Sequence, residues 1–218
     1  MYTFSYYFLL FFLYSFIGWI IEIADVLIEE KELTNRGFFI GPYVPIHGAG
    51  ALTIILYTSQ YKDNPLTVFL LAFIICSVLE YITSYLMEKL FNARWWDYSN
   101  FKFNLNGRIC LRNSFLFGVL GLLLIYTINP FISNIIEIIP TKITIIISII
   151  LFILFIADII VSFKITGKLK KTFNNMNIKK DNTTEIKEKV FKTLKENKRH
   201  LQIRVLKSFP NLNLRNKK

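Results

Sequence analysis

Residues 143–163 read ITIIISIILFILFIADIIVSF, and this stretch decides the class of the fold. It has the roughly 20 apolar residues that a helix needs to cross the hydrocarbon core of a bilayer, which is about 30 Å thick. Its single charged residue is Asp158. A run of this length and composition predicts a transmembrane helix and not the core helix of a water-soluble domain.

Four further apolar segments precede this helix along the chain. Three of them, at about residues 4–26, 66–90 and 114–131, approach or exceed the length that spanning requires. The first lacks the basic start and the small-residue cleavage site of a secretory signal, so we expect it to be retained. We therefore predict an all-α fold, a polytopic transmembrane helix bundle of about five helices within residues 1–163.

The segment at about residues 41–58 is the weakest of the five. It opens with GPYVPIHGAG, in which Pro42, Pro45 and several glycines disfavour a regular helix. We expect an irregular stretch before the helix, and protein or water must satisfy its backbone because lipid offers no hydrogen bonds. The sequence leaves open whether this segment spans the membrane fully or is re-entrant.

Residues 164–218 form a basic tail. They carry 17 Lys and Arg against 4 Asp and Glu, whereas residues 1–163 carry 9 against 11. A hydrophobic body with a basic extension indicates contact with the anionic cytoplasmic leaflet and not with nucleic acid. We expect a basic amphipathic helix on that leaflet, with docking to a cytoplasmic partner as the alternative. Its apolar stripe is Ile186, Val190, Leu194, Leu201 and Val205.

The loop charges predict the orientation. With the tail inside, the inner loops hold seven Lys and Arg and the outer loops hold two, which agrees with the positive-inside rule. Five crossings place the two termini on opposite sides. We therefore expect a multi-pass protein of the inner (cytoplasmic) cell membrane, with its N-terminus outside and its C-terminus in the cytoplasm.

Polar side chains gather near the predicted cytoplasmic ends of the helices. Ionisable residues within spanning helices usually face the bundle interior and carry a role. Glu22 lies on a polar face of the first helix, and a similar stripe follows the third helix from Glu80. The connecting loops add arginines, amides and a tryptophan. The candidate substrate-binding residues are therefore Glu22, Asn35, Arg36, Glu80, Ser84, Glu88, Trp96, Asp97, Asn106 and Arg108.

The chemistry of this predicted site stays open. Arg36 and Arg108, each near an Asn and a Gly, offer donors to a phosphate or carboxylate, and the glycines would let a ligand approach the backbone. The carboxylates could pair these arginines, relay protons or hold a cation. The structural alternative is that the same groups tie helices together, beside an interfacial belt of Trp and Tyr.

The remaining motifs exclude several classes of protein. Two cysteines make no disulfide framework, and no His/Cys spacing predicts a metal site. The TGK at residues 166–168 lacks the upstream glycine of a P-loop. Ser114, Gly118 and Gly121 share one helix face and predict a packing seam. Asp158 either pairs within the bundle or lies near the inner end of its helix.

Six motifs stand in order along the chain: YSFIGWIIE at 14–22, NRGFFIGPYVPIHGAG at 35–50, EYITSYLMEKLF at 80–91, WWDYS at 95–99, NLNGRICL at 104–111 and KSFPNL at 207–212. Together they resemble one family of bacterial membrane proteins, the CmpB-like ABC-transporter type IV permeases. The resemblance covers most of the chain and implies a multi-spanning membrane protein. It implies transport through the family's name, and a separate ATPase subunit as a candidate partner.

The leading hypothesis is a membrane permease subunit of an ABC-type transport system, with a polar site at the cytoplasmic membrane face and no cofactor. Two alternatives stand beside it. One is a membrane-embedded enzyme acting on a lipid phosphate or head group, for which Mg²⁺ is the candidate cofactor. The other is a membrane scaffold or regulator that acts through its basic tail. Expected contacts are the bilayer and, for the tail, anionic lipid; nucleic acid is not expected.

Overall fold

The computed structural model describes residues 2–31, 37–91, 93–175, 183–197, 199–208 and 213–214, and most of them are helical. The long helices are α1 (Tyr2–Glu30), α2 (Pro45–Thr58), α3 (Pro65–Phe91), α4 (Leu111–Leu123), α5 (Asn129–Ile138) and α6 (Thr141–Asn175). The tail adds α7 (Thr183–Glu196) and α8 (His200–Ser208). The predicted all-α helix bundle is confirmed.

The short elements lie between and after these helices. The 3₁₀ turn η1 (Ser59–Tyr61) follows α2, and the π-helical η2 (Leu124–Ile128) joins α4 to α5. Strands β2 (Asn104–Leu105) and β3 (Ile109–Cys110) form an antiparallel hairpin between α3 and α4. Strand β1 (Ala93–Arg94) pairs with β4 (Asn213–Leu214), so the end of the tail returns to the end of α3.

Four stretches of the described residues are long and apolar enough to span a membrane, one fewer than predicted. They are Tyr2–Ile28, Pro65–Phe91, Leu111–Ile138 and Thr141–Leu169. The missing fifth is α2, whose 14 residues rise only about 21 Å, less than the roughly 30 Å of the hydrocarbon core. An irregular stretch at residues 37–44 precedes α2 and shortens it. The sequence predicted irregular backbone within GPYVPIHGAG, residues 41–50; this is confirmed for 41–44, whereas 45–50 are helical.

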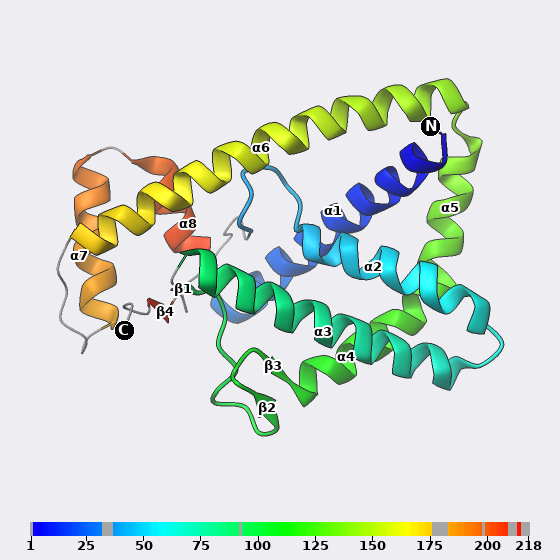
Figure 1. The fold of residues 1–218 in the computed structure, drawn as a ribbon, viewed down its shortest axis with the longest axis horizontal. Helices are drawn as coiled ribbons and strands as arrows, with labels where there is room; N and C mark the ends of the chain where they lie inside the picture. Colours follow the sequence, from blue (N-terminus) through cyan, green and yellow to red (C-terminus); the bar gives the residue numbers. More distant parts are fainter. Residues whose placement is uncertain are drawn as a thin grey trace.

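The arrangement of the helices shows how α2 still bridges much of the molecule. The N-terminus of α1 lies at one end, near the α5–α6 turn, and α7 and α8 lie at the opposite end (Figure 1). The loop at residues 37–44 returns to the middle of the molecule, and α2 runs from there toward the start of α3 (Figure 1). Helix α2 begins at Pro45, whose fixed φ suits the first turn of a helix.

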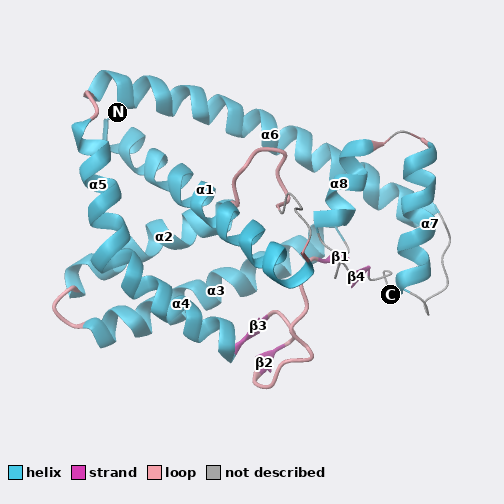
Figure 2. Ribbon diagram, turned by 180° about the vertical axis from the view of Figure 1, so that it is seen from behind, coloured by secondary structure: helices cyan, strands magenta, loops and turns pink. Residues whose placement is uncertain are grey.

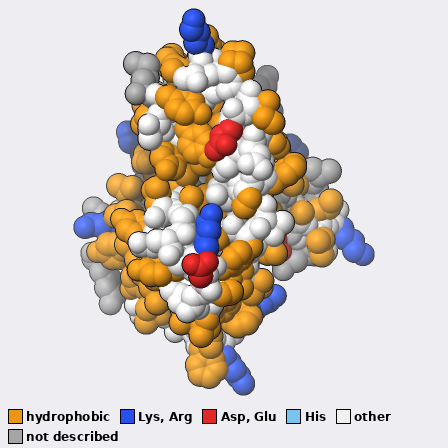
Figure 3. All heavy atoms as spheres, turned by 90° about the vertical axis from the view of Figure 1, so that its right-hand side faces the viewer, with side chains coloured by type: hydrophobic (Ala, Val, Ile, Leu, Met, Phe, Trp, Pro, Cys, Tyr) orange, Lys and Arg blue, Asp and Glu red, His pale blue; other side chains and the backbone are white. Residues whose placement is uncertain are grey.

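Much of the apolar surface faces outward. The view from the end nearest α5 shows mostly apolar side chains with only scattered charges (Figure 3). Along α6 large aliphatic side chains such as Ile146, Ile150 and Ile153 are about half exposed. In water such a surface would drive association, whereas in a bilayer it meets acyl chains.

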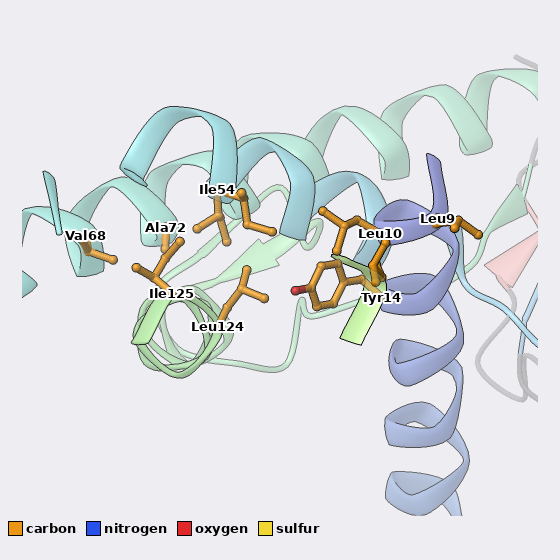
Figure 4. Close-up of a cluster of buried hydrophobic side chains, with 10 residues drawn as sticks. Leu9, Leu10, Tyr14, Ile54, Val68, Ala72, Leu124 and Ile125 are labelled. Atoms are coloured by element: carbon orange, nitrogen blue, oxygen red, sulfur yellow. The ribbon is translucent and has the colours of Figure 1, made fainter. Parts of the chain in front are cut away.

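The membrane core packs α1, α2, α3, η2 and α5 around one apolar cluster. Leu10, Ile54, Val68 and Ile125 lie within it and are almost completely buried (Figure 4). The predicted seam on α4 is confirmed. A Cβ on Gly121 would lie 2.2 Å from the Cβ of Ala72, so α3 and α4 meet at a contact that only a small residue permits.

Helix α6 does not stop at residue 163, where the sequence placed the end of the fifth segment. It continues to Asn175. Between α4 and α5 the chain changes direction at η2, just before Pro130 (Figure 2). A π-helical turn and a proline are the usual causes of such a bend.

The tail folds back onto the protein. Val190, Leu194 and Val205 are buried against Phe91 and Trp95, in a cluster that also includes Leu169. The predicted apolar stripe therefore exists in part, and its buried members pack against the ends of α3 and α6 of the same chain. Leu201 departs from the prediction because it is 47% exposed.

Candidate functional site

Glu80 is a buried carboxylate within a spanning helix. It lies on α3 and is 7% exposed. The Tyr98 hydroxyl donates to Glu80 Oε1 at 3.0 Å. Glu80 Oε2 accepts no hydrogen bond from the residues that the structure describes. Half of this carboxylate is therefore satisfied, and a buried polar atom without a partner requires an explanation.

Glu22 meets a histidine to which the sequence assigned no role. The Nε2 atom of His47, near the start of α2, lies 3.2 Å from Glu22 Oε1 on α1, and both side chains are about one third exposed. The contact depends on Gly18, where a Cβ would lie 2.4 Å from the Cβ of His47. Gly18 stands one helical turn before Glu22, which hinted at close packing without naming the partner.

Tyr98 donates to Glu80 and lies within electrostatic reach of Glu22. It follows β1 in the loop after α3. Burial raises the pKa of the Tyr98 hydroxyl, and the negative charges of Glu80 and Glu22 raise it further. Tyr98 therefore stays protonated and can donate to Glu80. Glu22, His47, Glu80 and Tyr98, which we call the Glu80 group, come from α1, α2, α3 and the following loop.

Two arginines share one carboxylate nearby. Arg94 Nε lies 3.3 Å from Glu88 Oε2, and Arg108 Nη2 lies 2.7 Å from the same oxygen. Arg108 Nη1 also donates to Ser84 Oγ at 3.2 Å, and Arg94 Nη1 contacts Asp97 Oδ1 at 3.3 Å. These five residues form the arginine cluster, which ties the end of α3 to the loop that follows.

Arg108 is held from several sides. Its guanidinium stacks over the rings of Tyr81 and Tyr85, at 5.7 and 5.4 Å from their centres. Its carbonyl oxygen accepts from Trp96 Nε1 at 3.1 Å. Since the side chain is 8% exposed and pairs with Glu88, Arg108 acts here as a structural tie.

The Asn-Gly pair in this loop also serves the fold. Asn106 donates to the Tyr81 hydroxyl at 2.9 Å, and both Asn106 and Gly107 have φ values near +60° (55° and 65°). That conformation is typical of a tight hairpin turn. A Cβ on Gly107 would lie 2.5 Å from Asp97 Oδ1, so the chain's own side chains occupy the space in which the sequence predicted a ligand.

Asp97 is held as an anion at the edge of the arginine cluster. Partial burial opposes its ionisation, but hydrogen bonds from Ser99 and the charge of Arg94 outweigh this effect and lower the pKa of the Asp97 carboxyl. The backbone N–H of Ser99 donates to Asp97 at 3.0 Å, and the Ser99 hydroxyl also donates to it. Asp97 therefore anchors the start of the loop.

A third polar group lies on α6, and the sequence left its role open. Asp158 accepts from the backbone N–H of Ile40 at 3.0 Å and of Gly41 at 2.8 Å, and also from the hydroxyls of Tyr43 and Ser162. Asp158 thus pairs within the bundle, which was one of the two interpretations. It fixes the irregular stretch that precedes α2.

The tail holds the same stretch from another side. Arg204 on α8 donates to the carbonyl oxygens of Phe39 at 2.6 Å and Ile40 at 3.3 Å. Burial lowers the pKa of the Arg204 guanidinium, and the negative charge of Asp158 opposes that shift. We call this arrangement the Asp158 clamp: Asp158 binds backbone amides of residues 40–41, and Arg204 binds carbonyls of residues 39–40.

The predicted site residues are therefore brought together only in part. Glu80 and Glu22 belong to the Glu80 group, and Ser84, Glu88, Asp97 and Arg108 belong to the arginine cluster, which Trp96 and Asn106 flank. Asn35 and Arg36 lie outside the described residues. Within the described ranges no three His, Cys, Asp or Glu side chains are placed to hold a metal ion.

Residues 9–163 match the sequence model of the family described as "Putative ABC-transporter type IV". The match covers well over half of the chain. The chain belongs to this family. No curated protein and no solved structure matches it.

The residues that match the family include most, but not all, of these polar groups. The Glu80 group, the arginine cluster and Asp158 all lie within the matched residues of this ABC-transporter type IV protein. Arg204 lies beyond them, in the tail. The clamp therefore joins the part of the chain that defines the family to a part that the family match does not include.

Proposed function

We propose that this chain is the membrane-spanning subunit of an ABC-type transport system, and that the Glu80 group contacts the transported solute. The family supports a role in transport. The apolar, outward-facing helices support a place in the membrane. Glu80 Oε2 is the observation that carries the site, because a buried carboxylate oxygen without a partner is costly unless a ligand or proton satisfies it.

The charges of this group favour a cationic solute or a proton over an anion. The carboxylates of Glu22 and Glu80 lie close enough to act on the same Tyr98 hydroxyl. Of the two arginines that the sequence offered to an anion, Arg108 pairs with Glu88, and Arg36 lies outside the described residues. A positively charged ligand would be attracted where an anion would be repelled.

In the cell we place the protein in the cytoplasmic membrane, with the tail inside and the N-terminus outside. The start of α1 and the end of α6 support this arrangement, because they lie at opposite ends of the molecule (Figure 1). The basic tail supports its cytoplasmic side. A separate ATPase subunit would supply the energy for transport.

The test is purification of the full chain in a mild detergent, followed by identification of bound proteins and assay of ATP turnover in nanodiscs. We expect a stoichiometric ATPase subunit and turnover that a cationic solute stimulates. Glu80→Gln should retain the subunit and lose the stimulation, whereas the matched exposed change Asp63→Asn should retain both. Absence of any ATPase subunit, or full stimulation in Glu80→Gln, would contradict the proposal.

The Asp158 clamp favours a second candidate function, regulation through the tail. Arg204 donates to the carbonyl oxygens of residues 39 and 40. Further along the same stretch, the Val44 N–H donates to the Ser15 carbonyl at 2.9 Å, and His47 follows three residues later. Release of α8 would free that stretch next to the Glu80 group. Arg204→Ala should change solute stimulation without loss of ATPase binding, and Lys207→Ala, an exposed change on the same helix, should not.

A further inference from the structure

The hairpin between α3 and α4 exposes large apolar side chains. Phe103 is 80% exposed, Leu105 is 55% exposed and Phe101 is 40% exposed. Phe103 also has a left-handed backbone, with φ 54°, which costs a non-glycine residue about 1 kcal/mol. Phe101 contacts the ring of Tyr98 at 5.9 Å, yet all three side chains keep much of their apolar surface exposed.

Many backbone groups of this hairpin are hydrogen-bonded within the hairpin, so it is an ordered element of the fold. Asn104 pairs with Cys110 and Leu105 with Ile109 across the two strands. The N–H of Leu111 donates to the Phe103 carbonyl at 3.0 Å. The Asn104 side chain accepts from the N–H of Gly107 at 2.9 Å and donates to the Phe101 carbonyl at 2.8 Å. Such internal pairing is what a non-helical segment needs where water is scarce.

Contacts with α3 fix the depth of the hairpin. Helix α3 has 27 residues and is therefore about 40 Å long, so it exceeds a hydrocarbon core of about 30 Å by roughly 5 Å at each end. The boundary then falls near Glu88. Asn106 and Arg108 reach Tyr81 and Tyr85, one to two turns below that level. The hairpin lies beside these turns, at the boundary between head groups and acyl chains.

The charged residues of the hairpin and the start of α4 are all basic. Between Tyr98 and Ser114 the sequence has Lys102, Arg108 and Arg112 and no acidic residue. Arg108 is buried, but Lys102 and Arg112 are exposed, and Arg112 lies over the ring of Phe101. Exposed cations beside exposed aromatic rings fit a surface with an apolar interior and anionic head groups.

We propose that the hairpin and the first residues of α4, together residues 98–112, form a membrane-interface anchor. It seats Phe101, Phe103 and Leu105 at the acyl boundary of the inner leaflet and places Lys102 and Arg112 on anionic phospholipid head groups. The anchor also supports the Glu80 group, because the N–H of Tyr98 donates to the carbonyl of Gly107 in the hairpin turn at 2.8 Å. The hairpin thus connects the lipid surface to Tyr98, which donates to Glu80. The functional meaning of this connection rests on the proposed role of Glu80 in solute contact.

The experiment places an environment-sensitive fluorophore on Phe103→Cys of the full chain in vesicles, with and without phosphatidylglycerol and with a quencher on the lipid. The matched control is Lys192→Cys on α7, also exposed, and unsubstituted protein treated alike corrects for labelling of Cys76 and Cys110. We expect about twofold or greater quenching at position 103 over position 192, and more with the anionic lipid.

Lys102→Gln combined with Arg112→Gln separates the two parts of the proposal. This variant should keep the quenching at position 103 but lose its dependence on phosphatidylglycerol. Equal quenching at positions 103 and 192 would overturn the anchor. Shielding of position 103 that arises only when an associated protein is added would instead make the hairpin a protein-docking surface.

Discussion

Asp158 and Glu80 are both carboxylates within spanning helices, but their surroundings differ. Asp158 accepts from two backbone amides and two hydroxyls and fixes the stretch before α2. Glu80 accepts from Tyr98 on one oxygen, and its other oxygen has no partner among the described residues. A fully satisfied carboxylate stabilises the fold, whereas a half-satisfied one is the better candidate for contact with a solute or proton.

The largest effect should follow removal of Asp158. Asp158→Ala leaves two amides and two hydroxyls without their acceptor, so we expect a loss of about 3 kcal/mol in the free energy of unfolding. Unfolding in mixed micelles measures it, with the exposed change Asp63→Ala as control. A loss no greater than that of Asp63→Ala would remove the distinction between Asp158 and Glu80.

Arg108 should come next, because it joins Ser84 and Glu88 to the hairpin. Arg108→Ala should cost about 2 kcal/mol in the free energy of unfolding, since it leaves Glu88 with one cation fewer in a largely buried place. Arg108→Lys should recover only part of this loss because it cannot reach both partners. Arg112→Ala, an exposed change in the same region, provides the baseline, and an equal effect of the two alanine variants would show that the tie is unimportant.

Asp97 extends the comparison to a carboxylate outside the spans. Its folded pKa lies below the ordinary value of 3.8, so its contribution to stability is present above that value and is lost as the pH falls through the folded pKa. The difference in unfolding free energy between the wild type and Asp97→Asn should be constant near neutral pH and should shrink below pH 3.8. A difference that grows on acidification would contradict this assignment.

Glu80 should have the smallest effect on stability. Glu80→Gln keeps an acceptor for Tyr98 and replaces an unpartnered buried oxygen, so we expect a change within about 0.5 kcal/mol. The same unfolding assay measures it. A loss as large as that of Asp158→Ala would show that Glu80 is structural, and the proposed contact with solute would lose its main support.

The sequence predicted which residues of α3 share one helix face, but it did not predict their contacts with other segments. The helical spacing of Glu80, Ser84 and Glu88 placed them on one stripe of α3, and the structure keeps them there. The partners come from distant segments: Glu88 pairs with Arg108, and Glu22 with His47. His47 is a lone histidine in a Gly/Pro-rich stretch, and the sequence around it does not indicate its partner. The close approach of α1 and α2 at Gly18 brings His47 to Glu22.

For the tail, too, the sequence predicted the helix face but not what covers it. Its periodicity predicted an apolar helix face, and Val190, Leu194 and Val205 are indeed buried. An apolar face can be covered by lipid, by a partner or by the same chain, and periodicity cannot distinguish among them. The turn between α7 and α8 and the bonds of Arg204 to residues 39–40 decide it in favour of the same chain.

By itself the sequence determined the membrane class, the apolar segments, the irregular stretch before α2 and the small-residue seam, because each depends on local composition and spacing. The tertiary structure alone decided which carboxylates are satisfied, that Arg108 pairs with Glu88 and Ser84, and that the tail packs against Phe91 and Trp95 at the end of α3. These outcomes depend on contacts between residues far apart in the chain, and no local pattern records which distant groups will meet.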